Sequence, residues 1–298
     1  CIMIKQRLMP ALFLACVLLF GACNESVISE IPEDPVTVTF NVSTLNVDTQ
    51  PMSRAAANSG TNLEEVVNTI GYHIFNSSGL LYKSDEISFK PGVDPVPDGF
   101  GEIKEVMMPD TYELYFYAYG KGNGTASWQV SDRFTSGFGI FYKDKEIFFH
   151  HASVEVTATK NFVEIPLTRK SALLVIDILD EVPETVSKVE YKFNDSKSYL
   201  FYYDKRDGTN QLQYEATITD DNKISKFEYY VPFPAETKQI TINIYDSSGL
   251  VISTKNLTVP MEANHKTIIS GNLFNSLGEK ELTILLDDIW GDDIEYEL

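Results

Sequence analysis

Histidines are the first candidates for chemistry in this chain, because they serve both acid–base catalysis and metal binding. His150 and His151 form the one adjacent pair. Neighbouring residues on a strand point to opposite faces, so this pair is poorly placed to share one metal ion. His73 and His265 are isolated and are expected at strand or surface positions. The sequence therefore predicts no metal site and no cofactor.

Two other patterns could suggest a ligand site. The segment Gly120–Thr125 is superficially similar to a phosphate-binding loop, but such a loop needs the N-terminus of a helix behind it. Strand-like sequence lies on both sides, so we expect the tip of a hairpin. Three acidic doublets lack the ligand spacing of a calcium loop and are expected to be solvated turns: Asp220-Asp221, Asp287-Asp288 and Asp292-Asp293. No nucleophile elbow or zinc-protease signature occurs, and no catalytic residue is predicted.

The N-terminal residues indicate export. Lys5 and Arg7 precede an apolar run over 12–20 that is too short to span a bilayer, which is typical of a signal peptide. The run ends in Gly21-Ala22-Cys23, which is similar to a bacterial lipobox, where the cysteine is acylated and becomes residue one. Cys16 is a weaker second candidate, and an ordinary secretory signal is the alternative. Because position 1 is Cys, translation is expected to start at Met3 or upstream.

Composition limits the function of the exported part. All three cysteines lie at or before Cys23, so the body has no thiol for disulfides, nucleophilic catalysis or metal binding. The formal net charge of −19 argues against nucleic acid and anionic lipid surfaces as partners. Hydrophobic residues form 43% of the chain, which excludes a disordered protein.

Alternation with a period of two predicts strands along most of the chain. Val36, Val38, Phe40 and Val42 alternate with polar residues, and the stretches 115–119 and 240–244 follow the same pattern. A short helix is predicted only over 62–69. With many aromatic and β-branched residues, these patterns favour an all-β protein of the sandwich type.

The chain is expected to comprise a signal peptide over 1–22, a tether over 23–35, and two β-sandwich domains over 36–166 and 167–298. An internal echo supports two related halves. The segment 74–81 matches 244–251, and both are predicted hairpins with an Asx-Ser-Ser-Gly turn. The echo by itself does not establish duplication.

The two ends of the body carry features that suggest processing and assembly. Arg54, followed by Ala55 and two further alanines in a polar stretch, is a candidate protease site, and an ordinary loop is the alternative. The C-terminal stretch 282–298 carries two alternating apolar runs: Leu282, Ile284 and Leu286, then Ile294, Tyr296 and Leu298. It is either a last edge strand of its own sheet or a strand donated to a neighbour.

Several short segments resemble the fimbrillins of Bacteroidetes. The resemblance rests on Asn264–Phe274, on Pro166–Ala172, on Val38-Thr39-Phe40 with Ser53-Arg54-Ala55, on Ile74-Phe75-Asn76 followed by Gly79, and on the late tryptophan in Leu286–Trp290. It implies two transthyretin-like, Greek-key β-sandwich domains in a lipoprotein pilin precursor. It also implies that an Arg-directed protease removes 23–54, including the strand Val36–Val42, which leaves an apolar groove. A neighbouring subunit would then fill that groove with a strand from about 282–298.

The sequence therefore predicts a shaft or tip subunit of a cell-surface fimbria, held at the outer membrane by lipid before processing. Its partners would be other fimbrial subunits and a host or bacterial surface receptor. One alternative is a permanently lipidated anchor or assembly protein. Another is a surface glycan-binding lipoprotein, in which Tyr199, Phe201, Tyr202 and Tyr203 could form a sugar platform, although such residues more often pack a core.

Overall fold

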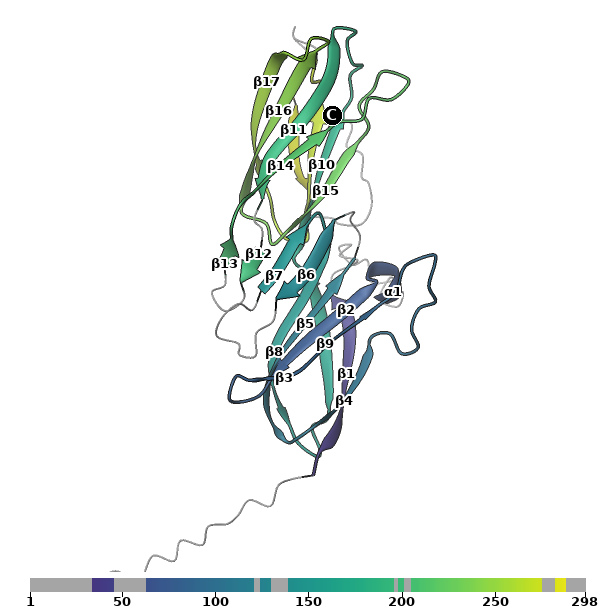
Figure 1. The fold of residues 1–298 in the computed structure, drawn as a ribbon, viewed down its shortest axis with the longest axis vertical. Helices are drawn as coiled ribbons and strands as arrows, with labels where there is room; N and C mark the ends of the chain where they lie inside the picture. The colour runs from purple at the N-terminus through teal and green to yellow at the C-terminus, as the bar shows by residue number, and fades with distance from the viewer. Residues whose placement is uncertain are drawn as a thin grey trace, which may run out of the picture. The chain divides into compact units, whose positions relative to one another are not determined.

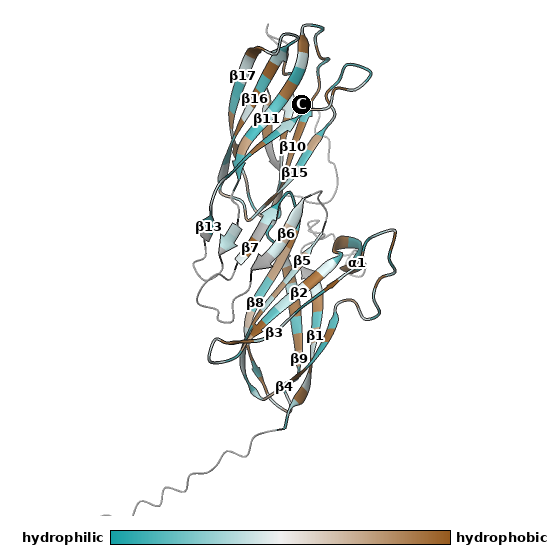
Figure 2. Ribbon diagram, viewed as in Figure 1, coloured by the Kyte–Doolittle hydropathy of each residue, from teal (hydrophilic) through white to brown (hydrophobic). Residues whose placement is uncertain are grey.

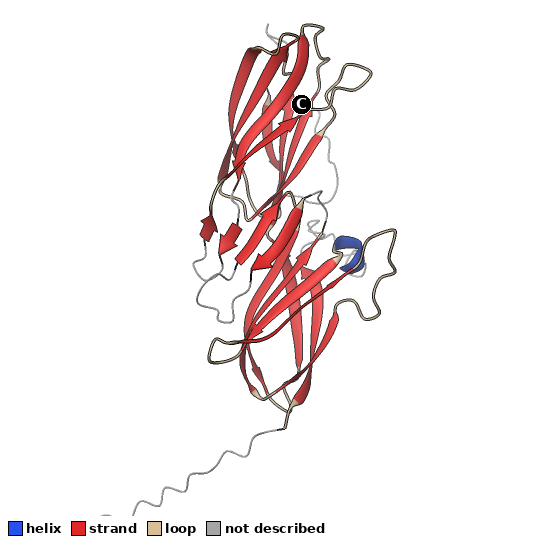
Figure 3. Ribbon diagram, in the orientation of Figure 1, coloured by secondary structure: helices blue, strands red, loops and turns tan. Residues whose placement is uncertain are grey.

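The computed structural model is almost entirely β, which confirms the predicted fold class (Figures 1 and 3). It describes residues 34–45, 63–120, 124–129, 139–195, 198–200, 205–274 and 282–287. The chain divides into two units, Cys1–Asp34 and Pro35–Leu298, and the strands belong to the second unit. The predicted helix is shorter than expected, because α1 covers Leu63–Val66 and β2 begins at Thr69. No helix in the described ranges has the length and hydropathy to cross a membrane.

The first sandwich is a seven-stranded sheet in the order β3-β2-β5-β8-β9-β1-β4, folded around one core. Its strands are β1 Val36–Leu45, β2 Thr69–Phe75, β3 Leu81–Ser88, β4 Glu102–Met107, β5 Asp110–Tyr119, β8 Ile147–Val156 and β9 Phe162–Arg169. Neighbours are antiparallel except β1 and β9, which run parallel. Apolar and polar residues alternate along several strands, so these strands bury one face (Figure 2), whereas β2 is buried on both faces.

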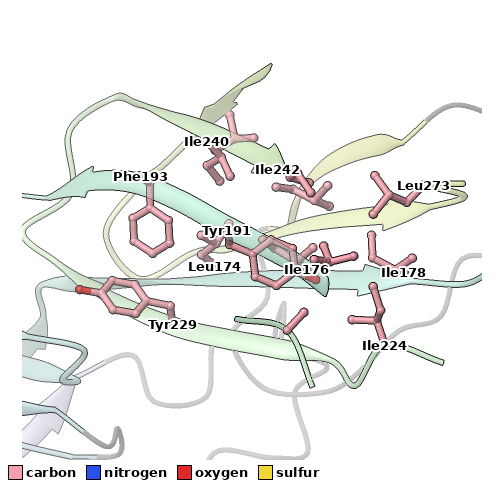
Figure 4. Packing of buried hydrophobic residues seen from close by; sticks show 14 of the residues in the cluster. Leu174, Ile176, Ile178, Tyr191, Phe193, Ile224, Tyr229, Ile240, Ile242 and Leu273 are labelled. Atoms are coloured by element: carbon pink, nitrogen blue, oxygen red, sulfur yellow. The ribbon is translucent and has the colours of Figure 1, made fainter. Parts of the chain in front are cut away.

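The second sandwich comprises two four-stranded sheets, β15-β10-β18-β19 and β14-β11-β16-β17. Its strands are β10 Ser171–Ile178, β11 Val186–Asp195, β14 Asn210–Glu215, β15 Phe227–Pro232, β16 Thr237–Asp246, β17 Val251–Pro260, β18 Lys266–Gly271 and β19 Thr283–Asp287. Side chains from both sheets fill a common core around Tyr191, Leu174, Ile176 and Ile242 (Figure 4). The predicted domain limits 36–166 and 167–298 stay predictions. The last residue of the first core is Leu167 and the first residue of the second core is Ala172, so the cores change on either side of Arg169.

A third sheet combines strands from both halves of the sequence, in the order β13-β12-β7-β6. Its strands are β6 Thr125–Gln129, β7 Gly139–Lys143, β12 Ser198–Leu200 and β13 Lys205–Asp207. The expectation of a hairpin at Gly120–Thr125 is wrong, because β5 and β6, which flank this segment, belong to different sheets and do not pair. The sequence showed strands on both sides of the turn but not their partners.

The two sandwiches repeat one connectivity. Strands β1, β2, β3, β4, β5, β8 and β9 pair in the same order and with the same relative directions as β10, β11, β14, β15, β16, β17 and β18. The exception is that β8 also pairs with β9, whereas β17 and β18 belong to different sheets. In each sandwich, the first strand lies between an antiparallel and a parallel neighbour. One difference interrupts the repeat: β19 pairs with β18 over five residue pairs, whereas β8, which holds the matching place beside β9, pairs with β9 at only two.

The two echoed segments form similar hairpins at positions that do not correspond in this repeat. Asn76 Oδ1 accepts hydrogen bonds from the amides of Ser78 and Leu80 at 3.1 and 3.0 Å, and the Asp246 carboxylate caps its own turn in the same way. Gly79 and Gly249 adopt φ of 71° and 80°, which favours glycine. However, β2–β3 corresponds to β11–β14, not to β16–β17. The match between segments 74–81 and 244–251 therefore reflects the same local turn chemistry. The similarity of the two sandwiches lies in their strand connectivity.

A buried carboxylate makes the stability of the second sandwich depend on pH. Burial raises the pKa of Glu190, but hydrogen bonds from Lys192, Tyr245 and Asn243 outweigh it and lower that pKa to about 2. The ordinary value is about 4.3, so the charged form stabilises the fold above that pH, and this contribution is lost as the pH falls toward 2.

We expect Glu190→Gln to lower the free energy of unfolding at pH 7 by about 1.5–3 kcal/mol, the usual worth of a hydrogen bond to a charged group. The difference from the parent protein should shrink between about pH 4 and pH 2. Urea midpoints at pH 7, 4 and 3 measure this, with the exposed Glu184→Gln as the matched control. An equal loss at all three pH values would contradict the assignment.

Candidate strand-exchange site

The site that the sequence reasoning singled out is the strand β1, and the structure places it in the interior of a sheet. Val38 and Phe40 are fully buried and Val42 is 5% exposed. Val36 is partly buried against the same core, and the Phe40 ring packs on Phe116 with centroids 5.3 Å apart. Burying a Val or Phe side chain stabilises a fold by roughly 1.5–3 kcal/mol. The four predicted side chains therefore share one apolar slot.

Both edges of β1 are hydrogen-bonded. The strand pairs with β4 over Val36–Asn41 and with β9 over Thr39–Leu45. The Thr39 amide donates to the Asn161 carbonyl at 2.9 Å, and the Asn41 amide side chain donates to Glu164 Oε2 at 2.7 Å. Removing β1 would thus expose the apolar slot and leave two unpaired strand edges, a template for another strand.

The predicted processing residues lie outside the described residues. These are Cys23, Arg54 and Ala55. In sequence, Arg54 lies between the end of β1 at Leu45 and the start of α1 at Leu63. A cut there would break the covalent link to β1 but none of its ladder bonds or core contacts. β1 would then leave only if something displaced it.

The predicted donor strand is described in part. Residues 283–287 form β19, which pairs antiparallel with β18 at the edge of its sheet. Leu282 and Ile284 are partly buried against the core of the second sandwich, and Leu286 lies within β19. Ile294, Tyr296 and Leu298 lie outside the described residues. The described part of the stretch thus pairs with its own chain, as one of the two readings of the sequence predicts.

A buried ion pair at the junction of the two cores was missed by the sequence reasoning. Arg169 Nε lies 2.8 Å from Glu146 Oε1, and both side chains are 3% exposed. Arg169 Nη1 also donates to Asn264 Oδ1 at 2.8 Å. A Cβ on Gly120 would lie 2.2 Å from Glu146 Oε2, so glycine is needed there for the carboxylate to approach. Burial lowers the pKa of Arg169, and the nearby Glu146 charge opposes this shift.

A cluster of aromatic residues also joins the two halves of the sequence. Tyr199 stacks on Phe233 with centroids 4.3 Å apart and planes at 15°, and Tyr142 packs on the same ring. These residues belong to or pack against a cluster that draws on both halves of the sequence. The Tyr199 ring is therefore part of a packed cluster, and the other three residues of the suggested sugar platform lie outside the described residues.

The histidines have separate partners. His151 Nε2 lies 2.8 Å from Glu113 Oε2, and the His150 ring hydrogen-bonds to the Pro166 carbonyl. His73, on β2, is buried beside Ser84, and this burial lowers its pKa to about 4. Within the described ranges, no three His, Cys, Asp or Glu side chains come together as metal ligands.

Similar solved structures come from Bacteroidetes. A candidate adhesin from Bacteroides ovatus shares 8% identity over 84% of this chain and 94% of its own, with a TM-score of 0.54. A candidate polysaccharide-binding protein from Bacteroides thetaiotaomicron shares 10% identity over 85% and 96%, with a TM-score of 0.54. The fimbrial anchor protein Mfa2 from Porphyromonas gingivalis shares 12% identity over 85% and 97%, with a TM-score of 0.44.

The two neighbours with TM-scores of 0.54 establish the fold, and they agree with the predicted resemblance to Bacteroidetes fimbrillins. A comparison with curated proteins finds no match. The profile of the family of unknown function DUF6562 matches residues 142–298. Because this match covers more than half of the sequence, the chain belongs to the family of unknown function DUF6562.

Proposed function

We propose that this protein is a structural subunit, shaft or tip, of a cell-surface fimbria that supports adhesion. It would be exported as a lipoprotein through Cys23, cut after Arg54 by an Arg-specific protease, and polymerised by donor-strand exchange. Its partners would be other fimbrial subunits and a surface receptor, and it would perform no catalysis. The fold that it shares with a candidate adhesin supports this proposal.

The observation that carries the proposal is the position of β1. An N-terminal strand that lies between two paired neighbours, and buries Val38, Phe40 and Val42, is also the strand that a cut at Arg54 would detach. Its slot offers two backbone edges and an apolar floor to a replacement strand. The alternation of Ile294, Tyr296 and Leu298 suits such a strand, because every second side chain can enter the slot.

The proposal is tested by comparing the parent protein with Arg54→Lys in native cells. Lysine keeps the charge but should resist an Arg-specific protease. The parent protein should begin at Ala55 without lipid and form polymers, whereas R54K should keep an acylated Cys23 and remain monomeric. Intact-mass measurement and gel electrophoresis without heating give these readouts, and Arg206→Lys, at an exposed arginine of β13, is the control. An acylated Cys23 on the parent protein would indicate a permanently lipidated anchor.

A further inference from the structure

A groove opens in the first sandwich where β8 and β9 separate. It has a volume of about 520 Å³ and is lined by residues 153–155 and 159–164. Ligand pockets typically measure about 300–1,000 Å³. Phe162, in the wall of the groove, is 59% exposed, although it is a large aromatic residue. Core packing does not explain an aromatic side chain in this position.

The sheet opens at this point because of Pro166. The hydrogen bond from the Thr39 amide to the Asn161 carbonyl shows which backbone groups of β9 point to which neighbour. The N–H and C=O groups of its odd-numbered residues point to β1, and those of its even-numbered residues point to β8. β8 and β9 pair only at Phe148–Arg169 and Phe149–Thr168. The next residue facing β8 is Pro166, which has no N–H to donate. The ladder ends there, and the backbone groups of Phe162 and Glu164 face the groove.

The second sandwich shows that this edge need not be open. The corresponding edge of β18 is covered by β19 over five residue pairs. In the first sandwich, β8 pairs only with Thr168 and Arg169 at the end of β9, and no other described strand pairs with this edge. The groove is therefore a specific difference between two sandwiches that otherwise share one connectivity.

Polar residues line the same groove as Phe162, and some of their side chains are held by hydrogen bonds. The Asn41 side chain bonds to Glu164 Oε2 at 2.7 Å, and Lys160 bonds to Glu155 Oε2. Thr159 and Asn161 add a hydroxyl and an amide to the same lining, each of which can donate and accept. The groove thus combines one apolar ring face with carboxylates, an amide, a hydroxyl and an ammonium group.

We propose that this groove binds a carbohydrate. A sugar ring would lay its C–H face on Phe162, while its hydroxyls bond to Glu155, Glu164 and Asn161. The charges of both signs suit a neutral ligand with many hydroxyls better than a simple anion or cation. An added peptide strand fits less well, because only Phe162 and Glu164 present an N–H to this edge before Pro166 interrupts it. The proposal does not depend on cleavage at Arg54 or on polymerisation.

Affinity electrophoresis of the full chain tests the proposal, with gels that contain mannan, β-glucan, xylan or mucin glycans. The parent protein should be retarded by at least one of them. Phe162→Ala and Glu164→Gln should each raise the apparent dissociation constant about tenfold, the equivalent of about 1.4 kcal/mol. Val106→Ala, which removes another exposed apolar side chain from β4 outside the groove, should leave retardation unchanged.

Circular dichroism should show that the variants fold like the parent protein, because Phe162 and Glu164 are exposed. Three results would overturn the proposal. They are no retardation by any of the four glycans, retardation that F162A and E164Q leave intact, or an equal loss with V106A. Because the full chain is tested without cleavage at Arg54, this outcome is independent of whether the chain forms a fimbria.

Discussion

Replacing Arg169 with methionine is expected to lower the free energy of unfolding by about 3–5 kcal/mol. The guanidinium and the Glu146 carboxylate are both 3% exposed and lie 2.8 Å apart, so the variant leaves a negative charge buried without its cation. It also removes the donor to Asn264, which links β9 to the loop before β18. Urea-induced unfolding followed by far-UV circular dichroism measures the loss.

Two matched variants separate burial from charge. Glu146→Leu combined with Arg169→Met should recover most of the lost stability, because an apolar pair can replace a buried ion pair at little or no cost. Lys160→Met breaks an exposed pair with Glu155, whose side chains are 66% and 60% exposed, and should cost at most about 1 kcal/mol. A loss below about 1 kcal/mol for R169M would contradict a structural role for the buried pair.

Phe40→Ala is expected to destabilise the first sandwich by about 3–5 kcal/mol, the usual cost of removing a buried Phe side chain. Phe40 is fully buried at the centre of β1, and its ring contacts Phe116 on β5 across the core. The same urea experiment measures the change. The variant should also lose β1 more readily once the chain is cut after Arg54, because the strand is then held only by noncovalent contacts.

Thr37→Ala is the control for this prediction, since Thr37 lies on the same strand with its side chain exposed. It should change the free energy of unfolding by no more than about 0.5 kcal/mol. If F40A cost as little as T37A, β1 would not be an integral strand of the sandwich. The proposed exchange of β1 for another strand would then lose its basis.

Much of the local structure follows from short stretches of sequence. The alternation at Val36, Val38, Phe40 and Val42 predicts both the strand and its buried face, because successive side chains point to opposite sides. The Asx-Ser-Ser-Gly turns predict two hairpins, since the capping bonds join residues only two to four apart. These interactions need no distant partner.

The sequence does not predict contacts between residues that lie far apart in the chain. The sequence predicts a hairpin at Gly120–Thr125 because strands flank it. However, β6 pairs with β7, which follows it in the chain, and not with β5, which precedes it. Arg169 and Glu146 lie 23 positions apart, and nothing in their local sequence marks them as buried. The groove between β8 and β9 likewise depends on Pro166, because its missing N–H has an effect only when β8 lies beside it.

The sequence by itself determined the all-β class, the strands with strong alternation, the hairpin turns and the absence of cysteine after Cys23. These follow from side-chain periodicity and residue type, which act over a few positions. Only the tertiary structure decided which strands pair, that both sandwiches share one connectivity, and that the edge of β9 is open where that of β18 is covered. Strand pairing depends on hydrogen bonds between residues far apart in the chain, and a local pattern cannot specify that choice.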